Sequence, residues 1–182
     1  MYRAIGMIEL SSIAKGIFAT DLMLKTAYVE VVSATSVCPG KYIAIIHGDV
    51  AAVESAISVG EETAGEYLID SFILPNVHPA VFPAITATTM PDQTGALGIM
   101  ESFSMSSMII AADAALKAAD IQALELRLGR GLSGKAYFTF TGDVAAVQAA
   151  IEAGKALIVE KGLLVDVEVI PSPSGRLWES LY

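Results

Sequence analysis

The chain has 182 residues, a net charge of −9 at pH 7, a sequence pI near 4.6 and a hydrophobic content of 54%. The acidic balance and the lack of any Lys/Arg cluster exclude a nucleic-acid surface, and no stretch reaches the roughly 18 uninterrupted apolar residues of a membrane-spanning helix. Charged residues make up only 17%, against about a quarter in typical globular chains, so the surplus apolar surface predicts an oligomer with extensive contacts between chains.

Residue patterns along the first half predict four strands and two helices. In chain order these are a strand over 3–10, a helix from Ser12 to about residue 27, a strand over 29–32, a loop over 33–40, a strand over 42–46, a helix over 50–63 and a strand over 67–74. Ser11 or Ser12 is placed to cap the first helix and Asp49 the second. Gly6, inside the first strand, predicts a close approach by another element.

The second half repeats the first. Ala4–Glu9 returns as Ala96–Glu101, and Gly48–Val53 returns as Gly142–Val147. The second copy is therefore predicted to contain strands over 96–102, 121–128, 135–141 and 163–170, and helices over 105–118 and 144–160, after a linker over 86–95. We expect one domain over 1–90 and a second over 91–182. The order β-α-β-β-α-β predicts an α+β fold (an α/β sandwich) of two ferredoxin-like domains, each an antiparallel sheet with two helices on one face.

Enzymatic function is not indicated. His47 and His78 have no nucleophile or metal-ligand partner at a recognisable spacing. Glu9 and Glu101 recur at matching positions, which favours a duplicated structural hydrogen bond over an acid/base pair. The single Cys fits a reducing compartment, and because the repeat begins almost at residue 1, we expect no leader segment and a cytoplasmic location.

Four short motifs resemble the bacterial microcompartment shell domain. They are Ala4-Ile-Gly-Met-Ile-Glu9, the helix end Asp21-Leu-Met-Leu-Lys25, Gly40-Lys41 and Gly48-Asp49-Val50, with counterparts in the second copy. Two such domains in one chain are similar to the tandem-domain shell class. The resemblance implies a homotrimer that forms a flat pseudo-hexameric tile and packs against other microcompartment shell proteins.

The loop Ser36-Val-Cys-Pro-Gly-Lys41 is similar to that of the iron–sulfur type in the propanediol-utilisation shell. This resemblance implies that Cys38 is a metal ligand and that three chains share one iron–sulfur cluster of the 4Fe-4S type. Three thiolates would leave one iron free for a non-protein ligand. The cluster would transfer electrons across the shell or be delivered to an enclosed redox enzyme. Two alternatives stay open at this loop: Cys38 as an ordinary half-buried residue, and a pore without a cluster.

The same resemblance assigns further residues to the pore and to the tile edge. The expected pore loop comprises Val37, Pro39 and Gly40 of the first copy and Gly131, Leu132, Ser133 and Gly134 of the second, with Arg130 just before it. The expected edge contacts are Lys25, Lys117, Asn76 and His78. The family's usual edge Arg is missing, and Arg176 lies further along the chain. A different class of function, a tandem ferredoxin-like sensor that binds a small molecule between its copies, is the alternative interpretation.

Overall fold

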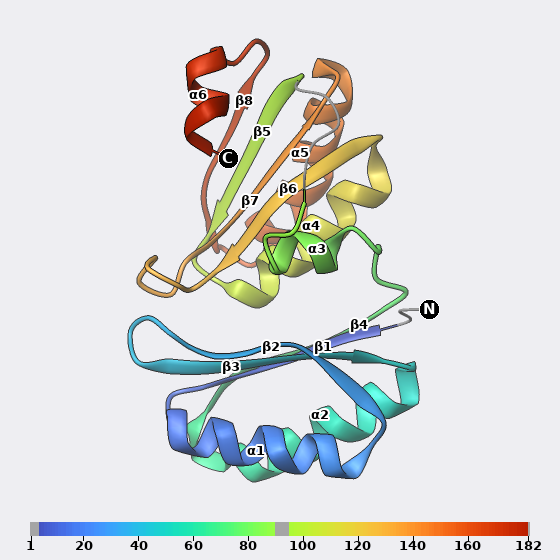
Figure 1. Ribbon diagram of the computed structural model, residues 1–182, viewed down its shortest axis with the longest axis vertical. Coiled ribbons are helices and arrows are strands. Elements are labelled where there is room, and N and C mark those ends of the chain that lie inside the picture. Colours follow the sequence, from blue (N-terminus) through green and yellow to red (C-terminus); the bar gives the residue numbers. More distant parts are fainter. Residues whose placement is uncertain (1–3, 90–94, 182) are drawn as a thin grey trace. The chain divides into compact units, whose positions relative to one another are not determined.

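The computed structural model describes residues 4–89 and 95–181, which form the helices and strands shown in Figure 1. The chain divides into two compact units. The first contains the residues up to Pro79 and the loop Gly129–Gly134, and the second contains Ala80–Leu128 and the residues from Lys135 onward. The division predicted at residue 90 falls in the part of the chain that is not described, as does the Pro91-Asp92 portion of the expected linker.

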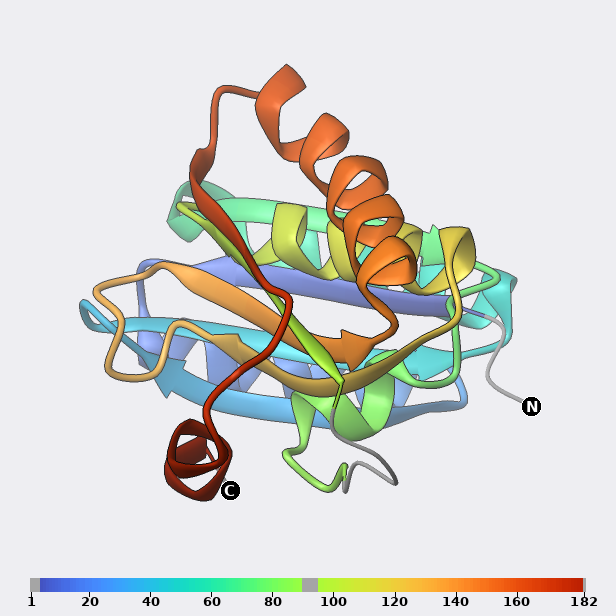
Figure 2. The ribbon, with the colours of Figure 1, turned by 90° about the horizontal axis from the view of Figure 1, so that it is seen from above.

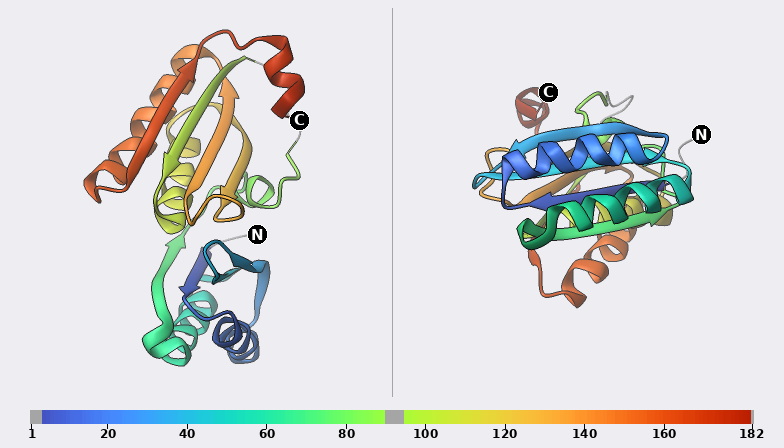
Figure 3. Two further views of the ribbon diagram at one scale, coloured as in Figure 1. Left: turned by 90° about the vertical axis from the view of Figure 1, so that its left-hand side faces the viewer. Right: turned by 90° about the horizontal axis from the view of Figure 1, so that it is seen from below.

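The first repeat folds in the predicted β-α-β-β-α-β order. Its elements are β1 (Ala4–Leu10), α1 (Ile13–Thr26), β2 (Val29–Val37), β3 (Lys41–Gly48), α2 (Val50–Ala64), the single-turn helix η1 (Gly65–Tyr67) and β4 (Leu68–Pro75). The sheet order is β2-β3-β1-β4 and every pair is antiparallel, which is the ferredoxin-like arrangement. Figure 3 shows α1 and α2 side by side on one face of this sheet.

The second repeat has the same order and topology. Its elements are α3 (Val81–Ile85), β5 (Ala96–Ser102), α4 (Met105–Ala118), β6 (Ile121–Leu128), β7 (Ala136–Gly142), α5 (Val144–Glu160), β8 (Leu164–Ile170) and α6 (Gly175–Leu181). The sheet order is β6-β7-β5-β8. Helices α4 and α5 cover one face, as Figure 2 shows from above. The predicted fold is therefore confirmed in both copies.

Local sequence signals account for the start of α1 and for the close packing of α2 on β1. Ser12 caps α1 by accepting a hydrogen bond from the Lys15 N–H at 3.2 Å. Asp49 is the N-cap residue of α2, as predicted, although its side chain accepts no cap hydrogen bond. Gly6 lies where a Cβ atom would come within 2.7 Å of Ile57 Cγ1 on α2, which confirms the predicted close approach.

The second strand is longer than predicted. The segment 33–37, expected to be loop because it is small and polar, continues β2 up to Val37 and pairs with β3. The pairing passes through a bulge between Val31 and Ser33, and the second repeat has the same bulge between Ala123 and Glu125. Small polar residues are poor strand formers alone, and here the neighbouring buried strand determines their conformation. The sequence patterns also do not predict two short helices, α3 and α6.

Candidate functional site

The turn that holds Cys38 joins β2 to β3 and spans three residues. Its backbone is closed by a hydrogen bond from the Gly40 N–H to the Val37 carbonyl at 3.0 Å. Gly40 has φ +83°, a left-handed conformation that costs Gly nothing, and the peptide bond between Cys38 and Pro39 is cis. Val37 is buried, whereas Pro39 and Gly40 are exposed. The Cys38 thiol is free and half-buried, so it lies at the accessible end of a hairpin.

The first unit also contains the other predicted pore loop. The Cys38 N–H donates to the Gly129 carbonyl at 3.2 Å, and Arg130 Nη2 donates to Thr35 Oγ1 at 3.0 Å. A Cβ atom on Gly134 would stand 3.4 Å from the Cys38 carbonyl oxygen. The structure therefore brings the two predicted pore loops together, and Arg130 serves there as a hydrogen-bond donor to Thr35.

The loop Gly129–Gly134 is built for left-handed turns. Gly129, Gly131 and Gly134 all have positive φ, and so does Ser133 at +52°. Gly131 and Ser133 are exposed, while Leu132 is half-buried. The loop offers backbone groups and one hydroxyl but no thiol, so Cys38 carries the only sulfur atom of the two loops.

Each predicted pore loop is followed by a lysine that is paired with the repeated glutamate. Lys41 Nζ donates to Glu9 Oε1 at 2.7 Å, and Lys135 Nζ makes the equivalent close ion pair with Glu101. The expectation that these carboxylates serve a structural hydrogen bond is thereby confirmed. The pairs tie the end of each turn to the central strand of its sheet, which explains why Gly-Lys recurs in both copies.

The two ion pairs differ in burial, which predicts different losses when the lysine is removed. The Glu9 side chain is 6% exposed and the Glu101 side chain 30%. We expect Lys41→Met to lower the free energy of unfolding by about 3 kcal/mol, because it leaves a buried carboxylate unpaired. Lys135→Met is the matched control and should cost about 1 kcal/mol or less, since water can solvate Glu101. Urea unfolding of both variants measures the difference, and equal losses would contradict this account.

His47 has the Glu30 carboxylate nearby. His47 Nε2 lies 3.7 Å from Glu30 Oε2, and burial lowers the pKa of His47 while Glu30 acts in the opposite direction. Within residues 4–89 and 95–181, no group of three or more His, Cys, Asp or Glu side chains is arranged to hold a metal ion. A metal centre built on Cys38 would therefore draw its other protein ligands from further chains.

The predicted edge residues lie at the ends of equivalent elements. Lys25 and Lys117 occupy the last turns of α1 and α4 and pair with Asp21 and Asp113, each at 2.6 Å. Both lysine side chains remain largely accessible. Asn76 and His78 follow β4; Asn76 is exposed with φ +53°, and His78 is half-buried. Their contacts to neighbouring tiles stay a prediction.

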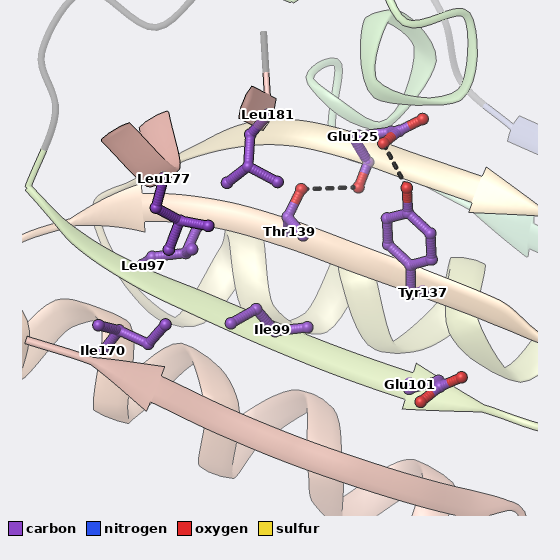
Figure 4. Close-up of a pocket in the computed structure, with 9 residues that line it drawn as sticks. All are labelled: Leu97, Ile99, Glu101, Glu125, Tyr137, Thr139, Ile170, Leu177 and Leu181. Carbon is purple, nitrogen blue, oxygen red and sulfur yellow. Dashed lines mark hydrogen bonds between the residues drawn. The ribbon is translucent and has the colours of Figure 1, made fainter. Parts of the chain in front are cut away.

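Sequence reasoning missed a pocket on the open face of the second sheet. It has a volume of 380 Å³ and lies opposite α4 and α5, with α6 along one side (Figure 4). The lining residues are Leu97, Ile99, Glu101, Glu125, Tyr137, Thr139, Ile170, Leu177 and Leu181. The sequence predicts the strands that line this pocket but not α6, which completes it. Leu177 and Leu181 are four residues apart, as on one face of a helix, but two positions are too few for a periodic signal.

Tyr137 in this pocket predicts a late titration. Its hydroxyl donates to Glu125 Oε2 at 2.6 Å, and burial together with that bond raises its pKa from 10.0 to about 12. Between these two values the folded chain keeps a proton that the unfolded chain has lost, so this group lowers stability as the pH rises from 10. Tyrosinate absorbance should show one of the six tyrosines titrating late, and Tyr137→Phe should remove that step. An unchanged curve would contradict it.

Among the described residues, no helix combines the length and the apolar character that a membrane crossing requires.

A model of the BMC domain family matches residues 4–77 and 96–173. The bacterial microcompartment shell protein PduT of Citrobacter freundii is 42% identical over 181 residues, which cover 100% of this chain and 98% of that protein. The carboxysome assembly protein CcmO of Synechococcus elongatus is 31% identical over 191 residues, covering 98% of this chain and 68% of CcmO.

Among solved structures too, this chain is similar to microcompartment proteins. A microcompartment protein from Desulfitobacterium hafniense superimposes with a TM-score of 0.95 at 49% identity, over 98% of this chain and 99% of that one. A fused permuted hexameric shell protein from the RMM microcompartment gives a TM-score of 0.61 at 22% identity, over 87% of this chain and 82% of that one. The second likeness concerns the fold alone.

Proposed function

From the premise that this chain belongs to the BMC domain family and is a tandem-domain shell protein of a bacterial microcompartment, we propose that three copies form one pseudo-hexagonal shell tile whose central loops hold an iron–sulfur cluster. Its named relatives are shell and assembly proteins, and the proposed role is likewise structural, with no catalytic centre of its own. The tile would pack edge to edge with other shell proteins.

The observation that supports the trimer is a difference in burial between equivalent helices. Ile17 on α1 is 55% exposed, while Ile109, its equivalent on α4, is fully buried. The same contrast holds at three further pairs: Ile13 and Met105, Asp21 and Asp113, and Leu24 and Leu116. Two copies of one fold present the same face, and only α1 leaves that face in water. If another chain covers this α1 face, apolar surface is removed from water, as the high hydrophobic content of the sequence predicts.

The donor chemistry of the Cys38 turn fits a cluster shared between chains. One chain offers one thiol, at an accessible turn tip, with no second cysteine in the sequence. A threefold axis would bring three thiolates together, and iron–sulfur clusters are held by cysteine thiolates. When bound, the cluster would supply one-electron redox chemistry at the shell. The chain's own part is to hold the turn: Gly40 shapes it, and the Gly129 carbonyl accepts from the Cys38 N–H.

Two measurements on anaerobically purified protein test the two parts separately. A native mass three times the 19.0 kDa of one chain supports the trimer, and iron and sulfide that are lost in Cys38→Ser support the cluster. A trimer without iron would leave a tile with an open pore. The sensor alternative predicts a discrete oligomer whose stability rises with a small-molecule ligand, whereas a tile predicts sheets or tubes at high concentration. The electron-transfer and cluster-delivery roles both remain within this proposal.

A further inference from the structure

The segment after the last strand of each repeat is the same element twice. Pro75 ends β4, and Pro171 directly follows β8. Three apolar positions of α3 match three of α6, each pair 96 residues apart in the sequence. The matched pairs are Val81 and Leu177, Phe82 and Trp178, and Ile85 and Leu181. The tethers are also alike, with five residues between β4 and α3 (76–80) and four between β8 and α6 (171–174). Because the two helices and their linkers are equivalent, we expect α3 and α6 to pack on equivalent surfaces.

The two helices differ in how well they are packed. Val81 and Ala84 on α3 are fully buried and Phe82 is 8% exposed, whereas α6 contains no buried residue and Leu181 is 43% exposed. Helix α6 meets its own sheet through Leu177 and Leu181, which line the pocket of Figure 4. A seven-residue helix gains little stability from propensity and depends on tertiary packing. Within the described part of its own chain, helix α6 therefore has no packing surface that buries its side chains as the side chains of α3 are buried.

The surface under α3 belongs to the repeat that follows it. Although α3 comes after the first repeat, it packs on β6 and α4 and is part of the second unit. The equivalent surface for α6 lies on β2 and α1. That surface is open: Val31 on β2 is 44% exposed where Ala123 on β6 is 3% exposed, and the α1 residues described above are exposed as well.

We propose that α6 packs on β2 and α1 of a second copy of this chain, in the way that α3 packs on β6 and α4. The inference rests on the trimer proposed above, because in a ring of alternating repeats the repeat that follows the second one is the first repeat of the next chain. The four-residue tether spans up to about 13 Å, which allows α6 to reach past the edge of its own sheet. The C-terminal helix of each protomer would then pack against the neighbouring protomer and stabilise the contact between them.

A photo-crosslink from α6 tests the proposal in the full-length chain. Trp178→p-benzoylphenylalanine, irradiated in the trimeric assembly, should give a covalent dimer on a denaturing gel, at twice the 19.0 kDa of one chain. Peptide mapping should place the link within residues 13–37. The matched control is Phe82→p-benzoylphenylalanine, which should link to β6 or α4 of its own chain and leave a 19.0 kDa band.

The outcomes separate this inference from the trimer itself. If the trimer forms but Trp178 links only to β5 or β8 of its own chain, the helix exchange is wrong and the tile stands. If the wild-type protein stays at 19.0 kDa, the trimer fails and the exchange fails with it. A second measurement needs no unnatural residue, because Trp178 is the only Trp in the chain. Its emission should shift to the blue when the trimer forms on concentration, and an unchanged spectrum would overturn the proposal.

Discussion

Wild-type protein purified without oxygen is expected to be brown and to contain about 1.3 iron atoms per chain, because four irons would be shared by three chains. Cys38→Ser is expected to be colourless, with iron below a tenth of that value, since it removes all three thiolates at once. The hydroxyl of Ser is close to the thiol in size, so the half-buried turn should keep its shape. Iron and sulfide assays, with the visible absorption spectrum, measure the effect.

The matched control for this experiment is Ser36→Ala. Ser36 is exposed near the end of β2, two residues before Cys38, and its change leaves every thiol in place. It should retain the wild-type iron content, and both variants should keep the native mass of the wild type. Iron that persists in Cys38→Ser, or colourless wild-type protein, would refute the cluster and leave the shell tile as an open pore.

The second large effect is expected from a charge placed on the exposed face of α1. Ile17→Asp should convert the proposed trimer into a 19.0 kDa monomer at micromolar concentration. The substitution forfeits the burial of an Ile side chain and forces a carboxylate into an apolar contact, a loss of about 3 kcal/mol at each seam. That corresponds to a dissociation constant raised on the order of a hundredfold. Analytical ultracentrifugation over a concentration series measures it.

Ser58→Asp is the control for this charge, because Ser58 is exposed on α2 of the same repeat. It should leave the assembly trimeric, and the far-UV circular dichroism of both variants should match the wild type. Position 17 lies in water in the isolated chain, so Ile17→Asp should not unfold the protomer. An Ile17→Asp protein that remains trimeric would show that the exposed α1 face is not the seam, and the assembly would need another interface.

Duplication gives a physical reason for one cysteine per chain. Six identical repeats around one centre would present six thiolates, more than the four iron atoms of a cubane cluster need. Fusing two repeats lets the loops diverge, and here the second loop reads Gly-Leu-Ser-Gly at 131–134 in place of a cysteine turn. Its backbone accepts the Cys38 N–H through Gly129. In the proposed tile, one loop thus supplies the ligand and the other holds it in place.

Burial explains where the sequence-based predictions failed. The segment Ser33–Ser36 is weak as a strand by composition, yet it pairs with a β3 strand that is almost wholly buried, and the backbone hydrogen bonds of that strand need a partner. Helices α3 and α6 are short, and their apolar positions are too few for a periodic signal. Both depend on a surface that comes from elsewhere in the chain or, as proposed here for α6, from another chain.

The sequence by itself determined the duplication, the order of strands and helices, a first-helix cap at Ser11 or Ser12, the close approach at Gly6 and the structural role of Glu9 and Glu101. Each of these depends on residue type and local spacing, and both can be read directly from the amino-acid sequence. Only the tertiary structure decided the length of β2, the pairing of Cys38 with Gly129, and the contrast between buried α4 and exposed α1. Those features depend on which distant surfaces meet, and the two repeats differ in burial where α3 packs on β6 and α4 of the second.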